Sequence, residues 1–486
     1  MGEGVLSKLK PEIVWNIFEE ITKIPRPSRR EEKIRSWVKS WADNHRIPSA
    51  EDSAGNIHLV AEPSPGFSNY PGLVLQAHMD MVCHRRSDLE FDFEKDPIRV
   101  KIEGEYVRAE GTTLGADNGI GMGLALATLI SKDLKHGPIE VVLTVGEEVG
   151  FIGAFQMKPG FFRGKYLINL DSESLGEITI SSAGGGDTIF TFPVKLKEHR
   201  GWRGLSISVD NLKSGHSGVE IHLPRLNAIK VVHGGIAELK SSMEVLLGEF
   251  EGGAAMNVIP ASAKATVLVQ KSKINTAINI LESWKSKTLD AARENEPGIK
   301  INISKADTSH GYPADVTSEI LGLIEDIPHG PISFSKDIAG LVQTSNNLAM
   351  VKSTPESFIV SVNSRSSVSS EMEELRARLR SSGIKHGASV ELKPEYPGWV
   401  SNPKSPLVML LKKTYEEVLG KEVSLRAVHA GLECGLFSKL NPQIQIASIG
   451  PDIQNAHSPE EMVHIESVSK VWEVIRRTIE NMNALS

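Results

Sequence analysis

The stretch LVLQAHMDMV, residues Leu73–Val82, decides how this chain is expected to fold. Its first half is almost entirely apolar, and such a run is typical of a strand that helices cover on both faces of a parallel sheet. His78 and Asp80 follow at the end of the run, two residues apart. Functional sites in open α/β sheets form beyond the carboxyl ends of the strands, so we expect this pair to lie at a site.

Three other apolar segments lead into side chains of the same kinds. The segments and the residues that follow them are Ile139–Val145 with Glu147 and Glu148, Tyr166–Leu170 with Asp171, and Ile444–Ile449 with His457. Asp117 differs, because it lies in a glycine-flanked turn before a predicted helix, LGADNGIGMG. Glycine allows a chain to turn tightly, so this turn can bring Asp117 close to the strand ends.

The order of the expected elements divides the chain of 486 residues into two domains. Helices and strands alternate near both ends of the chain, which predicts an α/β domain with a mixed, mostly parallel sheet flanked by helices. Between these parts, strands and helices follow in an α+β order that occurs twice, which indicates an inserted domain with a loose internal duplication. We therefore expect one domain from residues 1–186 and 400–486, interrupted by a second domain of residues 187–399.

The bulk composition excludes several classes of protein. The chain has 54 Lys and Arg against 61 Asp and Glu, and this mild negative charge argues against a nucleic-acid or membrane partner. Its two cysteines, Cys83 and Cys434, are far apart and have no metal-binding spacing. A reducing, cytoplasmic location is the plain interpretation.

The histidines and carboxylates together fit a centre of two divalent metal ions, which uses imidazole and carboxylate ligands. The expected arrangement gives one metal to His78 and Asp171 and the other to Glu148 and His457, with Asp117 bridging. Three carboxylates and one hydroxide between the metals balance the charge of two divalent cations. Zinc is expected, and cobalt or manganese suits the same ligands.

Two further acids have expected roles around these ligands. Asp80 can accept the second ring N–H of His78, since residues i and i+2 of a strand face the same way. Glu147 can face the water as a general base while its neighbour Glu148 binds metal. Each residue alone has a plainer interpretation, as a solvated turn, a helix N-cap or a surface histidine. Their common position at strand exits favours the metal site.

Several segments resemble the di-zinc peptidase family of aminoacylases, carboxypeptidases and carnosinases. Within that family they are most similar to the cytosolic aminoacyl-histidine (Xaa-His) dipeptidases. The resemblance extends along nearly the whole chain. The segments are HMD (His78–Asp80), TTLGADNGIGMG (Thr112–Gly123), GEEVG (Gly146–Gly150), NLDSE (Asn169–Glu173), NAHSPEE (Asn455–Glu461), HAGLECGLF (His429–Phe437) and SSAGGGDT (Ser181–Thr188).

The resemblance implies roles for residues in both domains. It implies that Glu147 is the general base, that Asp80 orients His78, and that the Asp117–Asn118 peptide is cis. It also implies that the inserted domain acts as a lid. In that lid, His216 would stabilise the oxyanion and Asn257 would contact the substrate. Arg365 would hold the substrate's carboxylate, and Gly431 would offer its backbone to the pocket, where Glu433 is a plausible further contact.

The expected function is therefore a metal-dependent dipeptidase that hydrolyses small unblocked peptides of the Xaa-His type. Two alternatives stay open at this point. A related N-acyl-amino-acid amidohydrolase would use the same ligands, and a catalytically silent relative would lack Glu147 or a ligand, which this chain does not. The sequence is compatible with a homodimer, and His216 could act in its own subunit or in a partner subunit.

Overall fold

The computed structural model describes residues 4–336, 340–400 and 402–485, and the chain folds into two compact units. Unit 1 comprises Met1–Ser181, Trp399–Ala427 and Glu433–Ser486, and unit 2 comprises Ser182–Gly398 and Val428–Leu432. The units differ from the predicted ranges at residues 182–186, at residues 428–432 and at Trp399, which belongs to unit 1. Residues 182–186 belong to unit 2, since its strand β9 already begins at Gly184. Residues 428–432 also belong to it, and the carbonyls of Val428 and Ala430 accept from the amide of Ala183.

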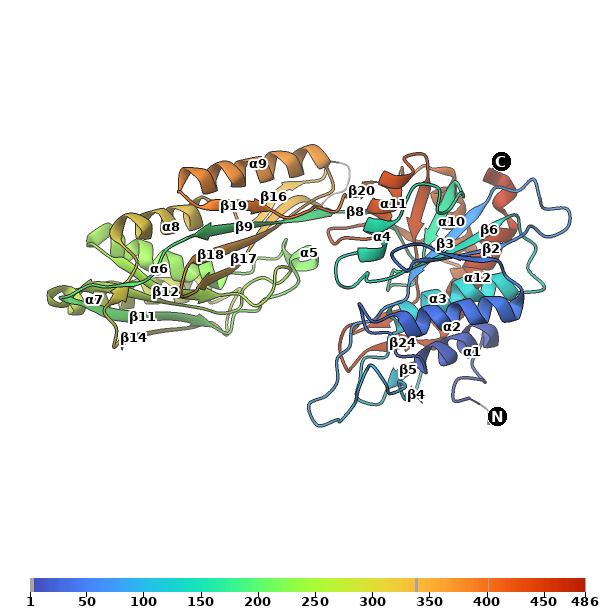
Figure 1. Ribbon diagram of the computed structural model, residues 1–486, viewed down its shortest axis with the longest axis horizontal. Helices are drawn as coiled ribbons and strands as arrows, with labels where there is room; N and C mark the ends of the chain where they lie inside the picture. Colours follow the sequence, from blue (N-terminus) through green and yellow to red (C-terminus); the bar gives the residue numbers. More distant parts are fainter. Residues whose placement is uncertain (1–3, 337–339, 401, 486) are drawn as a thin grey trace. The chain divides into compact units, whose positions relative to one another are not determined.

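Unit 1 is built on a mixed sheet with the strand order β1-β2-β6-β3-β7-β22-β8-β20, and β21 pairs with β8 (Figure 1). The strands β3, β6, β7 and β22 are parallel, and β2 and β8 flank them as antiparallel neighbours. Bounds are β1 Ser49–Glu51, β2 Ile57–Ala61, β3 Leu73–His78, β6 Ile139–Thr144, β7 Tyr166–Asn169, β8 Glu177–Ser182, β20 Trp399–Val400, β21 Ser424–Val428 and β22 Gln445–Ser448. Every residue of β3, β6 and β7 is buried, as the apolar runs predicted.

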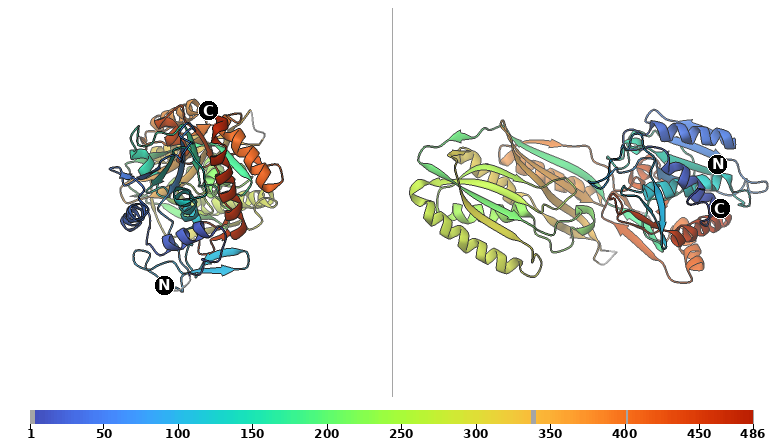
Figure 2. Two further views of the ribbon diagram at one scale, coloured as in Figure 1. Left: turned by 90° about the vertical axis from the view of Figure 1, so that its right-hand side faces the viewer. Right: turned by 90° about the horizontal axis from the view of Figure 1, so that it is seen from below.

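Helices cover this sheet and form the core of unit 1 with it. The helix α3 packs on β3 and β6 and also contacts α1 and α12, while α10 lies against α12 and β22 (Figure 2). Bounds are α1 Glu12–Thr22, α2 Glu32–His45, α3 Ala116–Ile130, α4 Ile152–Gln156, α10 Pro406–Leu419, α11 Cys434–Leu440 and α12 Ile465–Glu480. A small second sheet, β23-β24-β5-β4, was not predicted; its strands are β4 Val100–Glu103, β5 Tyr106–Ala109, β23 Ile453–Gln454 and β24 Met462–His464.

Unit 2 contains an antiparallel sheet with the order β14-β11-β13-β12-β17-β18-β9-β19, and β16 pairs with β17. Its strands are β9 Gly184–Phe192, β11 Trp202–Asp210, β12 Leu246–Gly252, β13 Ala263–Gln270, β14 Lys300–Ala306, β16 Gly330–Phe334, β17 Val342–Ser353, β18 Phe358–Ser366 and β19 Ser389–Leu392. A two-stranded sheet pairs β10 Lys197–Glu198 with β15 His310–Gly311. The sequence prediction missed β12, where Gly248 and a bulge between Leu247 and Phe250 interrupt the strand pattern.

The helices of unit 2 pack beside one another and on its sheet. Contacts join α6 to α7, α6 to α8 and α8 to α9, and α6 and α9 lie on the strands. Bounds are α5 Ser217–Glu220, α6 Ala228–Ser242, α7 Ile274–Ala292, α8 Ala314–Asp326 and α9 Ser369–Lys385. The order helix–strand–strand–helix–strand occurs from α6 to β14 and, with β16 added, from α8 to β19. The internal duplication stays a prediction.

Candidate metal centre

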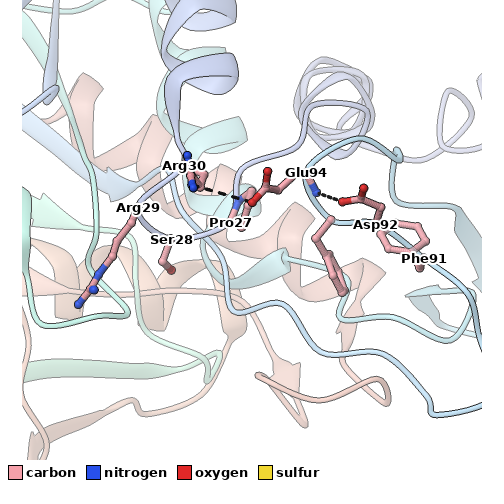
Figure 3. A pocket seen from close by; sticks show the side chains of 8 residues that line it. Pro27, Ser28, Arg29, Arg30, Phe91, Asp92 and Glu94 are labelled. Atoms are coloured by element: carbon pink, nitrogen blue, oxygen red, sulfur yellow. Dashed lines mark hydrogen bonds and ion pairs between the residues drawn. The ribbon is translucent and has the colours of Figure 1, made fainter.

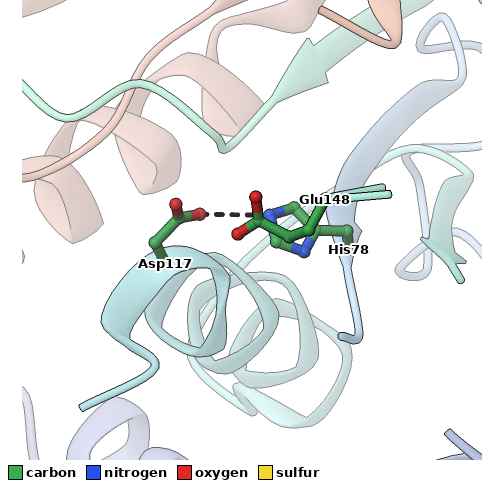
Figure 4. Close-up of side chains that lie close together, drawn as sticks. All are labelled: His78, Asp117 and Glu148. Atoms are coloured by element: carbon green, nitrogen blue, oxygen red, sulfur yellow. Dashed lines mark hydrogen bonds and ion pairs between the residues drawn. The ribbon is translucent and has the colours of Figure 1, made fainter. Parts of the chain in front are cut away.

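The carboxylate of Asp117 lies between two histidines of unit 1. Its Oδ1 is 3.0 Å from Nε2 of His78, and its Oδ2 is 3.1 Å from Nε2 of His457. Ligand atoms of His78, Asp117 and Glu148 all lie within 4.8 Å of one another (Figure 4). One carboxylate therefore presents a separate oxygen to each of two donor groups, as a ligand that bridges two metal ions must.

The remaining two acids complete one donor group each. Asp171 Oδ1 is 3.3 Å from Nε2 of His78, and Glu148 Oε1 is 3.0 Å from Nε2 of His457. The structure thus brings together both expected ligand pairs, and they share Asp117. Two ligand atoms on one tetrahedral zinc ion, with bonds of about 2.0–2.1 Å, are roughly 3.3 Å apart. The observed separations of 3.0–3.3 Å fit this spacing.

Local structure at α3 brings Asp117 into this position. The helix begins at Ala116, but Asp117 and Asn118 have non-helical backbone angles and the peptide between them is cis. The Asn118 side chain donates to Asp171 Oδ1, which links the turn to the exit of β7. Gly121 stands where a Cβ would lie 1.8 Å from Asn118 Oδ1, so a larger residue would disrupt this contact.

The charges of the cluster favour a bound cation. Hydrogen bonds to Asp117 and Glu148 raise the pKa of His457 to about 11. Burial opposes protonation of His78, yet the Asp171 charge and the hydrogen bonds to Asp117 and Asp171 raise its pKa well above the usual value. Without another cation, both imidazoles therefore take up protons to balance the carboxylates. Divalent metal ions that displace these protons would supply positive charge to the carboxylates in their place.

Glu147 is next to Glu148 but points elsewhere. Its Oε2 is 4.0 Å from Nε2 of His78, beyond the spacing of the ligand pairs. Burial, with the nearby charges of Asp171 and Glu148, raises the pKa of Glu147 well above that of a free glutamate. A carboxyl group with a raised pKa beside a metal site is suited to take and return a proton near neutral pH.

Asp80 contacts the His78 ring with both its main-chain carbonyl and its carboxylate. The ring Nδ1 of His78 hydrogen-bonds to the main-chain carbonyl of Asp80 at 3.1 Å, and the carboxylate Oδ1 lies farther off, at 3.4 Å. Strand β3 ends at His78, so strand alternation does not extend to Asp80. The carboxylate also accepts from the amides of Glu147 at 3.0 Å and Glu148 at 3.3 Å. Asp80 thereby joins the exits of β3 and β6.

The expected substrate-binding residues belong to unit 2 and form their own cluster. The His216 ring and the Arg365 guanidinium flank Gly218, since a Cβ there would lie 3.0 Å from His216 Cε1 and 3.1 Å from Arg365 Nη1. The carbonyl of Asn257 accepts from the amide of Ser217 at 2.8 Å. The structure therefore brings His216, Asn257 and Arg365 together.

The Arg365 side chain is 6 % exposed and rests on neutral groups. Its Nε donates to Asn363 Oδ1 and its Nη1 donates to the Tyr396 hydroxyl, both at 3.1 Å. Gly431 belongs to the segment Val428–Leu432, where the His429 ring hydrogen-bonds to Ser345 at 2.7 Å. Ser345 is directly opposite Arg365 in the pairing of β17 with β18, which places this segment near the arginine.

Comparisons with known proteins decide the family. The model of peptidase family M20/M25/M40 matches residues 74–481. The chain belongs to this family. It is 37 % identical to the cytosol non-specific dipeptidase of Escherichia coli K12 over 483 residues, covering 99 % of each protein. A solved aminoacylhistidine dipeptidase from Vibrio alginolyticus matches with a TM-score of 0.87 at 34 % identity, covering 98 % of both chains. Human carnosine dipeptidase 1, at 13 % identity, shares the fold, with a TM-score of 0.51 and coverage of 97 % and 96 %.

Membership of this peptidase family makes the chain a peptide hydrolase. Buried polar residues lie next to the cluster, and the sequence analysis missed most of them. Glu433 is fully buried, and its Oε2 accepts from Gln76 and Thr144, both at 2.7 Å. Gln76 Oε1 accepts in turn from Asn169 at 2.6 Å. A lone glutamine inside the apolar run of β3 was the available signal.

A surface hollow of this peptidase lies beside Asp80. Its volume is about 560 Å³, and its lining is Pro27, Ser28, Arg29, Arg30, Phe91, Asp92, Phe93 and Glu94 (Figure 3). The Ser28 hydroxyl donates to Asp80 Oδ2 at 2.8 Å. None of the five candidate metal ligands lines this hollow, so it is separate from the donor cluster.

Within the described residues, no helix has the length and apolar content to cross a membrane.

Proposed function

We propose that this peptidase is a di-metal dipeptidase that hydrolyses small unblocked peptides, including those of the Xaa-His type. One observation carries the proposal, namely that the two oxygens of Asp117 face two different histidines, each paired with a further carboxylate. The proposed ligands are His78 and Asp171 for one ion, Glu148 and His457 for the other, and Asp117 for both. Zinc suits these nitrogen and oxygen donors, as do cobalt and manganese.

The chain's own residues account for the remaining steps. Two bound divalent ions would polarise the scissile carbonyl and activate a water molecule. Glu147 takes the proton from that water at its carboxylate and returns it to the leaving amine. Asp80 keeps the exits of β3 and β6 in register through the amides of Glu147 and Glu148. Glu147 would thus place a carboxylate where the reaction transfers a proton, and Asp80 would keep Glu147 and Glu148 in position.

Substrate recognition is proposed for the cluster in unit 2, which would act as a lid. Arg365 is a buried cation whose hydrogen-bond acceptors named above are neutral, so a substrate carboxylate would supply the missing charge. His216 would stabilise the oxyanion, and Asn257 and Gly431 would contact the peptide. Names of relatives support the substrate class, since one is a non-specific dipeptidase and another an aminoacylhistidine dipeptidase. The first is named for the cytosol, and we propose the cytoplasm for this chain.

A substrate panel tests the function directly. The purified protein is stripped of metal with a chelator, reloaded with Zn²⁺, Co²⁺ or Mn²⁺, and assayed on β-alanyl-histidine and other free dipeptides. Matched dipeptide amides and N-acetyl amino acids are the controls. We expect metal-dependent cleavage of free dipeptides and weak cleavage of the amides. Cleavage of acetyl amino acids alone would show an N-acyl amidohydrolase, and no cleavage of any dipeptide would refute the proposal.

A further inference from the structure

The turn that carries Asp117 is held from two sides at Gly115. This residue has a φ of 70°, a left-handed conformation that glycine adopts readily. Its amide donates to Glu461 Oε2 at 2.9 Å, and its carbonyl accepts from Nη2 of Arg26. A Cβ at this position would lie 2.5 Å from that Arg26 nitrogen and 2.9 Å from the sulfur of Met81. A single residue therefore lies between a buried guanidinium and a buried carboxyl group.

Glu461 joins this turn to the loop that carries His457. Its side chain is in the same NAHSPEE segment and is 2 % exposed. Besides Gly115, its carboxylate accepts from the amide of Leu114 at 2.7 Å and from the amide of Asp117 at 3.2 Å. Three amides of one turn thus bind one carboxylate, and removal of that carboxylate would leave buried donors unpaired.

Arg26 joins the same turn to the exit of β3. It is 2 % exposed, and its Nη1 donates to the carbonyls of Met79 at 3.0 Å and Asp80 at 2.9 Å. The Asp80 carbonyl also accepts from the ring Nδ1 of His78. One guanidinium therefore fixes the backbone on both sides of the space in which His78 and Asp117 meet.

We propose that Arg26 and Glu461 are positioning residues that set the orientation of the Asp117 carboxylate between His78 and His457. The inference rests on the proposed two-metal centre. The two residues bind main-chain groups at the exit of β3 and in the Asp117 turn, and Glu461 itself belongs to the loop that carries His457. Their contribution is therefore geometric. Groups that orient metal ligands in this way typically change metal affinity or activity by about 10–100-fold when they are removed.

Conservative variants test this role on the full-length protein. Glu461→Gln keeps one acceptor oxygen, and Arg26→Lys keeps the charge but cannot reach three carbonyls. Apoprotein is titrated with Zn²⁺ against a competing chelator, and the absorption spectrum of the Co²⁺ form is recorded. We expect each variant to bind metal about 10–100-fold more weakly with an altered Co²⁺ spectrum. The double variant should bind Zn²⁺ about as tightly as the single variant with the lower affinity, because both substitutions act on the same turn.

Glu140→Gln is a matched control. Glu140 is also buried in unit 1 and accepts from the amides of Arg163 and Gly164, but it lies at the opposite end of β6 from the metal ligands. The Glu140→Gln substitution should lower the melting temperature and leave Zn²⁺ affinity and the Co²⁺ spectrum unchanged. If Glu461→Gln fails to fold, Gly115→Ala changes the residue whose amide Glu461 binds. Its Zn²⁺ affinity and Co²⁺ spectrum then provide the same test.

The outcomes separate this inference from the proposed function. A wild type that binds two ions while the folded variants match it in affinity and spectrum would overturn the positioning role alone. Additive losses in the double variant would overturn the shared turn as its basis. A wild type that binds fewer than two ions would refute the metal centre itself, and with it this inference.

Discussion

At the scale of single residues, the decisive feature is the division of roles between the neighbouring acids Glu147 and Glu148. Glu147 and Glu148 follow the same strand, yet Glu148 Oε1 is 3.0 Å from His457 Nε2, and Glu147 Oε2 is 4.0 Å from His78 Nε2. Asp80 fixes both backbone amides and so fixes the divergence of the two side chains. Chemistry at this site therefore depends on a backbone orientation that one carboxylate maintains.

This division predicts different outcomes for two neighbouring substitutions. Glu147→Gln should keep both metal ions and lower kcat by about 10²–10⁴-fold, because only the proton-accepting group is lost. Glu148→Gln should lose affinity for one ion, because its oxygen belongs to a proposed ligand pair. Metal content and steady-state rates of the two variants check both statements. An unchanged kcat in Glu147→Gln would exclude this residue as the base.

Metal affinity should depend on pH in a defined direction. The pKa of His457 is raised to about 11 by its hydrogen bonds to Asp117 and Glu148, so it is protonated at pH 7 in the metal-free protein. Metal requires the neutral imidazole, so binding must release that proton, and affinity should rise about tenfold per pH unit for each proton released. Titrations in buffers of different ionisation enthalpy count the protons. Affinity that stays constant from pH 6 to pH 8 would contradict the protonated state of this histidine.

At the scale of elements, the ends of the central strands are cross-linked by buried polar side chains. Glu433, at the start of α11, binds Gln76 of β3 and Thr144 of β6 through one oxygen. Asn169 of β7 extends the connection to a third strand. These three strands lead to His78, Glu148 and Asp171, so the network fixes the spacing of strand exits that supply ligands.

The same network predicts a stability that falls with rising pH. Burial raises the pKa of Glu433 from 4.5 to about 8, so the folded protein holds this proton more tightly than the unfolded chain. In metal-free protein, its contribution to stability is therefore full below about pH 4.5 and is lost as the pH rises to about 8. Glu433→Gln keeps an acceptor oxygen and cannot ionise. From pH 5 to pH 8, the melting temperature of this variant should rise relative to that of the wild type. A melting-temperature difference that stays constant over this range would disprove the raised pKa.

Sequence could predict these elements where the local pattern matched the environment. The apolar runs of β3, β6 and β7 are fully buried, and the side chains at or just after their ends supply three of the five candidate ligands, His78, Glu148 and Asp171. The other two, Asp117 and His457, come from a turn and a loop. Contacts between distant segments left no such pattern. Arg26 binds carbonyls at residues 79, 80 and 115, and nothing in the sequence around Arg26 shows which carbonyls it will meet. The strand β12 was missed for a local reason, because its glycine and bulge break the alternation.

At the scale of the whole molecule, each unit has its own hydrophobic core. One core is made of residues such as Trp15, Phe18 and Leu75, all from unit 1, and the other of residues such as Phe190 and Phe250, all from unit 2. A ligand or substitution that acts on one core should therefore change the stability of that unit first. The proposed metal ligands all belong to unit 1, whereas the proposed contacts to the peptide belong to unit 2.

Calorimetry of the full chain should then show two transitions with separate responses. Saturating metal stabilises the unit that binds it, by about 4 kcal/mol at a free concentration a thousand times Kd, and chelation should lower only that transition. Asn227→Ala acts on the other unit, because Asn227 caps α6 through the amides of Ile229 and Lys230 and also donates to the Leu348 carbonyl. It should cost about 1–2 kcal/mol there and leave Zn²⁺ affinity unchanged. If metal and Asn227→Ala shifted one common transition, the two units would unfold together, and metal binding in unit 1 would also stabilise the cluster of unit 2 that is proposed to bind the peptide.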